Sequence, residues 1–275
     1  MKGIPTVSIV IPAYNTAAFI RETLGSILAQ TYSDFDIIVI NDGSTDGTEG
    51  VVKSFSDKRI RYAFKSNEGV SIARNTGFSF SQGQYIVFFD ADDVMRSDFL
   101  EKRVGALENN KAIDFCCGIL EFFPIHKEQL GACDDIPSEI LLYNQRIETC
   151  PSNYMFRRSV VERVKFHPQL SSTADRFFLL QVAQFAKGIR IEEGKLQYRF
   201  NPNSMSGRLT PQYVEDNERF YQLLNDNKLI PKHLEKAALL KGYYILGAMN
   251  WKISKPFKAL KYFIKLLLTF VLPKI

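Results

Sequence analysis

The chain of 275 residues is long enough for one large domain, or two small ones, with a sizeable core. Its hydrophobic content of 45% and charged content of 24% are ordinary for a globular protein, and four cysteines are too few for a disulfide scaffold. Of the 35 basic residues, seven are lysines within 241–275, which has no acidic residue; the other 28 face 30 acidic residues. This distribution argues against a nucleic-acid partner and places the basicity near the C-terminus. The N-terminal residues carry no secretory pattern, so we expect a cytoplasmic protein.

The first hundred residues alternate between two periodicities. Short β-branched or aromatic runs predict strands buried on both faces at 6–11, 36–41, 60–64 and 85–89. Helical patterns lie between them at 17–31, 45–56 and 69–82, and Thr16 is the expected N-cap of the first. This alternation predicts right-handed βαβ units and a mainly parallel sheet.

The pattern is looser after about residue 114. We expect a strand at 113–123, irregular chain to about 150, helices at 157–164 and 174–187, a strand within 189–208 and helices from Thr210. The chain is therefore divided into three parts, 1–114, 115–210 and 211–275.

Polar residues follow three predicted strands where each strand ends: PAYN (12–15), NDGSTDGT (41–48) and DADD (90–93). Ligands of open parallel sheets bind beyond the carboxyl ends of the strands. Carboxylates as close as Asp90, Asp92 and Asp93 repel one another, so we expect a cation beside them. Because the chain has neither GxGxxG nor a Walker sequence, a bound diphosphate would need a divalent ion, Mg²⁺ or Mn²⁺, between it and Asp90 and Asp92. The alternative is an Asp that caps a helix near Ser97.

Asp42, in the second of these strand ends, has two interpretations. Asp-Gly pairs are ordinary turn signals, and Ser44 or Thr45 could cap the next helix. Beside the other two strand ends, Asp42 is also a suitable acceptor for a base imide or a ribose hydroxyl.

Four segments together resemble a known family. VSIVIPAYN, DIIVINDGSTDGT, NEGVSIARNTG and YIVFFDADD are similar, in this order and spacing, to the inverting nucleotide-sugar glycosyltransferases of family 2. The match is dense over 6–100, and residues 173–206 are similar to the acceptor-side segment of that family. The resemblance implies an α/β GT-A fold, Rossmann-like, with a mainly parallel sheet flanked by helices and here a helical C-terminal extension. It also implies that 1–114 bind the nucleotide sugar and 115–210 the acceptor.

The resemblance implies roles at the matching positions. The nucleotide-binding residues would be Pro12, Ala13, Tyr14, Asn15, Asp42, Arg74, Asp90 and Ala91. Asp90 and Asp92 would form the DxD motif, with Asp92 as the direct ligand of Mn²⁺ or Mg²⁺, and Asp93 would support them or cap a helix. Asp175 would be the general base; the family usually has Glu-Asp where this chain has Ala174-Asp175. Arg199 and Ser204 would belong to a loop that can close over the donor.

The chemistry of such a transfer fits these residues. A departing diphosphate must be neutralised, and a carboxylate must deprotonate the acceptor hydroxyl as it attacks. We expect a single displacement with inversion, from a nucleoside-diphosphate sugar to a hydroxyl of a glycan or a lipid-linked acceptor. The resemblance implies UDP as the nucleotide carrier. VFFDADDV also fits the hhhhDxDx[TV] pattern of haloacid-dehalogenase-type phosphatases, with Asp90 as nucleophile and Asp92 as acid/base. A non-catalytic sugar-nucleotide-binding protein is a further alternative, suggested by Ala174.

The segment KPFKALKYFIKLLLTFVLP (255–273) predicts an amphipathic helix. Lys255, Lys258, Lys261 and Lys265 fall within one third of a helical wheel, and apolar residues cover most of the rest. The longest uncharged run, 266–272, is far shorter than the ~20 residues of a membrane span. We expect a helix lying in the plane of an anionic membrane, on its inner face. The alternative is a helix packed on the protein with its lysines extended into water.

Overall fold

The computed structural model describes residues 4–125, 127–133, 136–142, 147–199 and 208–271. A seven-stranded sheet lies at the centre of the fold, in the order β11-β6-β10-β4-β1-β2-β3. Its strands are β1 (Val7–Ala13), β2 (Phe35–Asp42), β3 (Ile60–Lys65), β4 (Tyr85–Phe88), β6 (Phe115–Cys117), β10 (Tyr154–Arg157) and β11 (Gly188–Arg190). All neighbours in this sheet pair in parallel except β10, which runs antiparallel to β4 and β6.

A second, five-stranded sheet has the order β5-β12-β7-β8-β9. It consists of β5 (Val94–Met95), β12 (Leu196–Arg199), β7 (Ile119–Phe123), β8 (Lys127–Gly131) and β9 (Ile147–Glu148). The run 113–123, expected as one strand, thus divides at Gly118 between the two sheets. Strand β10 is not predicted from the sequence: it lies between the stretch expected to be irregular, which ends at about 150, and the helix expected at 157–164. Its four residues are too few to give a periodic signal.

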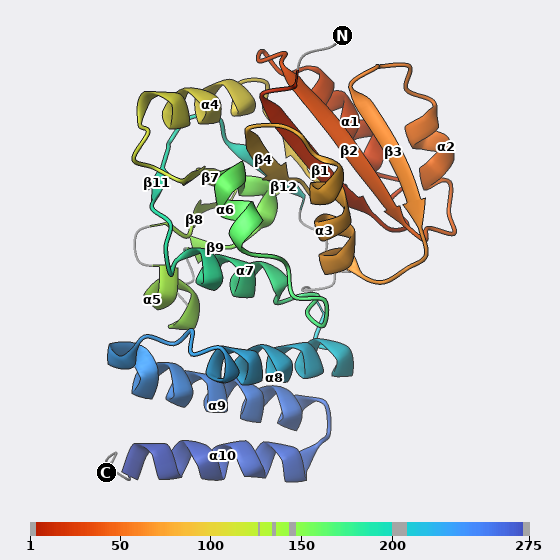
Figure 1. The fold of residues 1–275 in the computed structure, drawn as a ribbon. Helices are drawn as coiled ribbons and strands as arrows, with labels where there is room; N and C mark the ends of the chain where they lie inside the picture. The colour runs from red at the N-terminus through yellow and green to blue at the C-terminus, as the bar shows by residue number, and fades with distance from the viewer. Residues whose placement is uncertain (1–3, 126, 134–135, 143–146, 200–207, 272–275) are drawn as a thin grey trace.

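Helices cover both faces of the central sheet (Figure 1). They are α1 (Ile20–Leu28), α2 (Thr48–Lys53) and α4 (Phe99–Asn109) on one face, and α3 (Val70–Phe80), α6 (Arg158–Arg163) and α7 (Ala174–Val182) on the other, with α5 (Ile136–Leu141) beside α7. Strand β1 is buried on both faces, since Ile9 and Ile11 pack in the core on the side of α1, α2 and α4, and Val10 packs in the core on the side of α3, α6 and α7. The edge strand β3 is only half-buried, so the expectation of burial on both faces is wrong there.

The start of α1 differs from the sequence prediction. Helix α1 begins at Ile20 after Phe19, and the hydroxyl of Thr16 makes no cap; instead the Thr16 carbonyl accepts the amides of Phe19 and Ile20. The chain therefore enters α1 through a backbone turn.

Helix α3 lies very close to β1. A Cβ on Gly77 would lie 2.3 Å from Cγ1 of Val10, a separation that only glycine permits. This close approach fixes the position of α3, whose N-terminal half faces the candidate site.

The C-terminal residues form three helices in successive layers below α7, as Figure 1 shows. They are α8 (Pro211–Asp226), α9 (Glu235–Lys252) and α10 (Pro256–Val271). Within the described residues, no helix combines the length and the hydropathy that a membrane crossing requires.

Candidate active site

The carboxyl ends of β1 and β2 are linked by hydrogen bonds between their turns. Asn15 has a left-handed backbone, with φ of 52°, and its Oδ1 accepts the amide of Thr45 at 2.8 Å. Its own amide donates to Oγ of Ser44 at 2.9 Å. Ser44 and Thr45 thus hold this turn, whereas the residue preceding α2 is Gly47, with no side-chain cap. Pro12 and Ala13 are buried at the end of β1, and Tyr14 is exposed beyond them.

Asp42 is buried, and both of its carboxylate oxygens accept hydrogen bonds. Its Oδ1 accepts from Nζ of Lys65 at 2.7 Å and from the amide of Glu68 at 3.1 Å, and its Oδ2 accepts from the amide of Gly69 at 2.8 Å. This carboxylate therefore anchors the start of α3. The amides bound by Asp42 belong to the NEG residues that precede α3.

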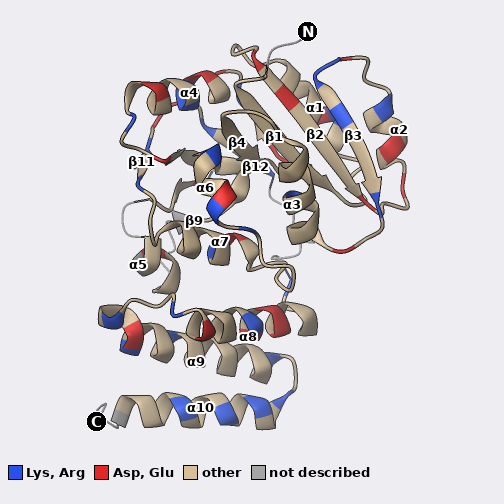
Figure 2. Cartoon of the chain, in the orientation of Figure 1, with Lys and Arg blue, Asp and Glu red and all other residues tan. Residues whose placement is uncertain are grey.

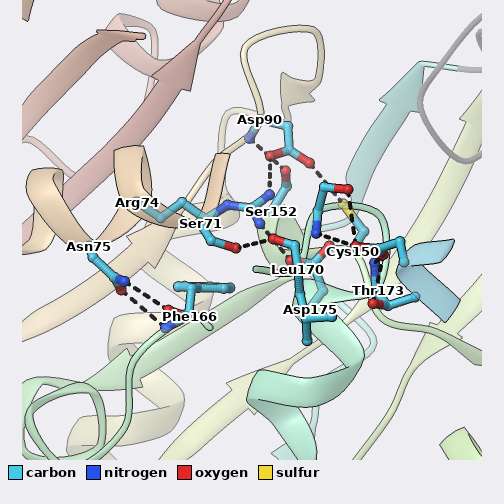
Figure 3. Close-up of polar contacts among 12 residues, drawn as sticks. Ser71, Arg74, Asn75, Asp90, Cys150, Ser152, Phe166, Leu170, Thr173 and Asp175 are labelled. Atoms are coloured by element: carbon cyan, nitrogen blue, oxygen red, sulfur yellow. Dashed lines mark hydrogen bonds and ion pairs between the residues drawn. The ribbon is translucent and has the colours of Figure 1, made fainter. Parts of the chain in front are cut away.

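Arg74 lies between two carboxylates that are far apart in sequence (Figure 3). Its Nη1 donates to Oδ1 of Asp175 at 2.7 Å, and its Nη2 donates to Oδ1 of Asp90 at 2.8 Å. The guanidinium also lies 4.9 Å from the ring centre of Phe166. Burial alone lowers the pKa of Arg74, but Asp175 and Asp90 raise it above its ordinary value, so the side chain stays charged.

Helix α3, which carries Arg74, also binds the backbone of the segment that leads to Asp175. Ser71, Arg74 and Asn75 recur at helical spacing and point to the same side. Oγ of Ser71 donates to the carbonyl of Leu170 at 2.6 Å, and Asn75 exchanges two hydrogen bonds with the backbone of Phe166, at 2.8 and 3.1 Å. The segment that precedes Asp175 is therefore attached to α3 at Phe166 and Leu170.

The acidic cluster closes β4. The amide of Asp90 donates to Oγ of Ser152 at 2.9 Å. Burial raises the pKa of Asp92 to about 6, with a further contribution from Asp90. Burial and the neighbouring carboxylates Asp92 and Asp90 raise the pKa of Asp93 well above its usual range. None of these residues caps a helix near Ser97, because β5 follows directly and α4 begins only after Asp98.

Three ligand atoms in this cluster, from Asp90, Asp93 and Cys150, lie within 4.8 Å of one another. Among the described residues Asp92 is outside that group, although the sequence pairs it with Asp90. Sγ of Cys150 lies 3.6 Å from Oδ2 of Asp93, and burial, with Asp93 and Asp90, raises the pKa of this thiol well above its ordinary value. Cys150 is therefore a neutral hydrogen-bond donor.

Asp175 is in the first turn of α7. Burial raises its pKa to about 7; Arg74 opposes this rise, and Asp90 and Glu148 add to it. The side chain keeps 23% of its surface exposed, so a ligand could reach it. A carboxylate that titrates near neutrality and can be reached is suited to accept a proton.

Arg199, at the end of β12, reaches the acidic cluster. Its amide donates to Oδ1 of Asp93 at 3.2 Å, and its Nε donates to the carbonyl of Asp92 at 2.9 Å. Its Nη2 forms an ion pair with Glu22 of α1. Ser204, which the resemblance places in the same loop, lies outside the described residues.

Ala91 is buried, and its carbonyl accepts a hydrogen bond from Thr23 at 2.9 Å.

Four residues at this site were not found from the sequence. Ser152 and Cys150 lie beside the acidic cluster, Glu148 is near Asp175, and Lys65 binds Asp42. Three of them belong to residues 148–152, which have no periodicity, and a lysine in an edge strand is not by itself informative. Cys150 and Ser152 directly precede β10, and the pairing of β10 with β4 brings them beside the acidic cluster.

Residues 8–164 match the sequence model of the family described as "Glycosyl transferase family 2". The chain belongs to glycosyl transferase family 2. A relative along most of its length is the uncharacterized glycosyltransferase EpsJ of Bacillus subtilis, 30% identical, with 89% of this chain and 72% of the relative aligned. An uncharacterized glycosyltransferase of Haemophilus influenzae is also 30% identical, covering 89% of this chain and 82% of its own. This glycosyl transferase family 2 member is thus an enzyme. The glycosyltransferase interpretation therefore takes precedence over the phosphatase and the non-catalytic alternatives.

Solved structures show that this member has the GT-A fold. S. aureus TarS in complex with UDP-GlcNAc aligns with a TM-score of 0.68 at 16% identity, over 96% of this chain and 89% of that one. The mannosyltransferase PcManGT of Pyrobaculum calidifontis, in complex with GDP-Man and Mn²⁺, aligns with a TM-score of 0.64 at 17% identity, over 100% and 77%. Both the α/β class and the mainly parallel sheet predicted from the sequence are confirmed.

Proposed function

We propose that this glycosyltransferase moves a sugar from a nucleoside diphosphate to an acceptor hydroxyl by a single inverting displacement, with Asp175 as the general base. The observation that carries the proposal is the guanidinium of Arg74, which joins Asp175 to Asp90 at the carboxyl end of the sheet. This contact joins a carboxylate with a pKa of about 7 to the acidic cluster, which supports the assignment of Asp175 as the base.

The acidic cluster has the chemistry of a site for Mn²⁺ or Mg²⁺. The raised pKa of Asp92 records burial and repulsion by Asp90, a cost that a divalent cation would relieve. The neighbouring thiol of Cys150 is held neutral, so oxygen ligands dominate, as these hard ions prefer. Asp92 and Asp90 would hold the ion, with Asp93 behind them. When bound, it would neutralise charge on the departing diphosphate.

The nucleotide is assigned to the joined ends of β1 and β2. The exposed Tyr14 offers a ring for a base, and Asn15 shapes the turn beside it. Pro12, Ala13 and Ala91 are buried, and we assign their backbone to the wall beside the nucleotide. Asp42, already bound to Lys65, would accept from the base or ribose through its remaining lone pairs.

Within the described residues, the buried Nε of Arg74 has no partner. A phosphate oxygen would satisfy this donor. Arg199, already beside Asp92, is assigned with Ser204 to the donor loop.

The test is a thermal-shift screen of nucleotide sugars with and without Mn²⁺, starting with UDP-GlcNAc and GDP-Man, the donors named for TarS and PcManGT. The donor that stabilises the protein most is then used in a turnover assay with Asp175→Asn. A true base contributes about 10²–10⁴-fold, so this variant should bind the donor normally and lose turnover by that factor. Wild-type turnover in Asp175→Asn would contradict the assignment.

The C-terminal helices supply a second feature, a surface for an anionic membrane. Helix α10 packs on α9 through the buried Ala259 and through Tyr262, which stacks on Tyr243. The alternative expectation, a helix packed on the protein, is therefore correct for this one face of α10. The opposite face of α10 is apolar and exposed, formed by Phe257, Leu260, Ile264, Leu267 and Leu268.

The charges around this face favour a lipid partner. Lys255 and Lys258 pair with Glu215 and Glu218 of α8, at 3.4 and 2.7 Å. The lysines nearer the C-terminus, Lys261 and Lys265, are exposed on the flank of the apolar face, and Figure 2 shows basic residues along α10. An apolar face flanked by lysines fits anionic lipid in the plane of the membrane.

This arrangement suggests a division of roles. Residues 1–114 would bind the donor, 115–210 the acceptor, and 211–275 would hold the enzyme on the cytoplasmic face of the membrane. A lipid-linked glycan acceptor would give that contact a purpose.

A further inference from the structure

One carboxylate of α8 binds the segment immediately before Asp175. Asp216 is buried, and its Oδ2 accepts three hydrogen bonds: from the amide of Thr173 at 2.8 Å, from Oγ1 of Thr173 at 2.7 Å, and from Oγ of Ser172 at 2.8 Å. Its Oδ1 accepts from the amide of Ser171 at 2.8 Å and from its hydroxyl at 3.2 Å. Both oxygens are therefore occupied by residues 171–173.

The next residue of α8 binds the other side of Asp175. Oδ1 of the fully buried Asn217 accepts from Nη2 of Arg176 at 2.8 Å. The Asn217 amide nitrogen donates to the carbonyl of Tyr213 within α8, which fixes the orientation of the side chain. Two consecutive α8 residues thus hold the chain before and after the proposed base.

We propose that Asp216 is a positioning residue for the transfer reaction, acting through Asp175. The inference rests on the proposed function, because it takes Asp175 as the base. Asp216 fixes the N-terminus of α7, and Asp175 is the second residue of that helix. The backbone and hydroxyl donors of 171–173 converge on one anion, an arrangement stronger than neutral hydrogen bonds would give.

The physical basis of the proposal is that the reaction tolerates very little displacement of the base. Arg74 pulls Asp175 toward Asp90 from the sheet side, and Asp216 fixes the same turn from the helical side. A misplacement of about 1 Å at a reacting group can cost about 10²-fold in rate. Loss of Asp216 should therefore reduce turnover and leave donor affinity intact.

Asp216→Asn is the direct test, because it keeps the shape and removes an acceptor facing three donors. Asp226→Asn is the matched control, the same change at an exposed position of the same helix. We expect Asp216→Asn to lower the turnover number for UDP-GlcNAc, or for the donor that wins the thermal-shift screen, by about 10–10²-fold with an unchanged KM. Hydrogen exchange of the 173–176 amides should quicken in Asp216→Asn and not in Asp226→Asn.

The double variant Asp175→Asn/Asp216→Asn distinguishes positioning from a general loss of stability. If Asp216 acts only through Asp175, the second substitution adds no further loss of turnover to the first. Multiplying losses would overturn the proposal, as would turnover and exchange in Asp216→Asn equal to those of Asp226→Asn. A different outcome, wild-type turnover in Asp175→Asn alone, would reject the proposed base itself.

Discussion

Arg74 and Asp175 form an ion pair of 2.7 Å in which the guanidinium is almost fully buried. Burial raises the pKa of Asp175 and the guanidinium lowers it, and the balance is a pKa of about 7. A general base works in its ionised form, so turnover should rise with pH and reach half its maximum near pH 7. The pH dependence of kcat/KM, which reports groups of the free enzyme, measures this, and a profile flat from pH 5 to 8 would contradict it.

Removing the guanidinium should move that midpoint upward. In Arg74→Gln the opposing charge is lost while burial and Asp90 remain, so the pKa of Asp175 rises further and turnover at pH 7 falls. Arg74→Lys is the control, because it keeps the charge but cannot bridge Asp175 and Asp90 with a planar fork. Its midpoint should lie between those of the wild type and Arg74→Gln. A midpoint for Arg74→Gln below that of the wild type would exclude this account.

The same carboxylate links stability to pH. The folded protein retains a proton on Asp175 that the unfolded chain releases above its ordinary pKa of 3.8. Protons bound in the native state therefore exceed those in the unfolded state between about pH 4 and about 7, and stability from this group falls as pH rises through that range. We expect the Tm without ligands to fall from pH 5 to 7.5, and to fall less in Asp175→Asn. An equal fall in both proteins would assign the effect to other groups.

Metal binding should depend on pH through Asp92. Asp92 has a pKa of about 6 and must lose its proton to bind a cation, so Mn²⁺ affinity should rise between pH 5 and 7. Calorimetric titration of the wild type with Mn²⁺ measures this directly, and Asp92→Asn should abolish the pH dependence together with most of the binding. Chelation with EDTA should stop turnover, and excess Mn²⁺ should restore it. Full turnover in EDTA would show that the reaction needs no ion.

Gly77 offers a test of the packing that positions α3. In Gly77→Ala the new Cβ would meet Val10 at 2.3 Å, so α3 must move away from β1. Overpacking of this kind costs about 1–3 kcal/mol, which should appear as a lower denaturation midpoint. Gly25→Ala in α1 is the matched control, since that Cβ has no neighbour within 4 Å and alanine favours a helix. Equal stabilities for the two variants would contradict the close approach.

The sequence predicts this molecule best where the chain is both periodic and local. The strands and helices of residues 6–100 appear at the expected places because buried parallel strands consist of unbroken apolar runs. Their polar ends converge because parallel strands share one edge, which brings Asn15 to Thr45 and Arg74 to Asp90. The resemblance supplied Asp175, which no pattern of spacing would connect to Arg74 across a hundred residues.

The parts that could not be predicted depend on long-range pairing. The division of 113–123 between two sheets is decided by the partners of β6 and β7, which come from residues 127–199. The positions of Cys150 and Ser152 follow from that pairing. Likewise, Asp216 looks like a surface residue of an amphipathic helix until α8 is placed against the start of α7.

The apolar face of α10 makes the last prediction. Leu260 and Leu267 are exposed to 56% and 62%, so changing both to Gln should leave the fold intact while removing apolar surface that lipid would cover. Full-length protein should co-sediment with vesicles containing anionic phospholipid, and the double variant should bind much less. Phe64→Gln is the matched control, an exposed apolar residue of β3, far from α10 in sequence. Because Lys261 and Lys265 flank the face, binding should weaken with salt and on vesicles of neutral lipid alone. Equal binding of the wild type and the Leu260/Leu267 variant would remove the membrane from the function of this helix.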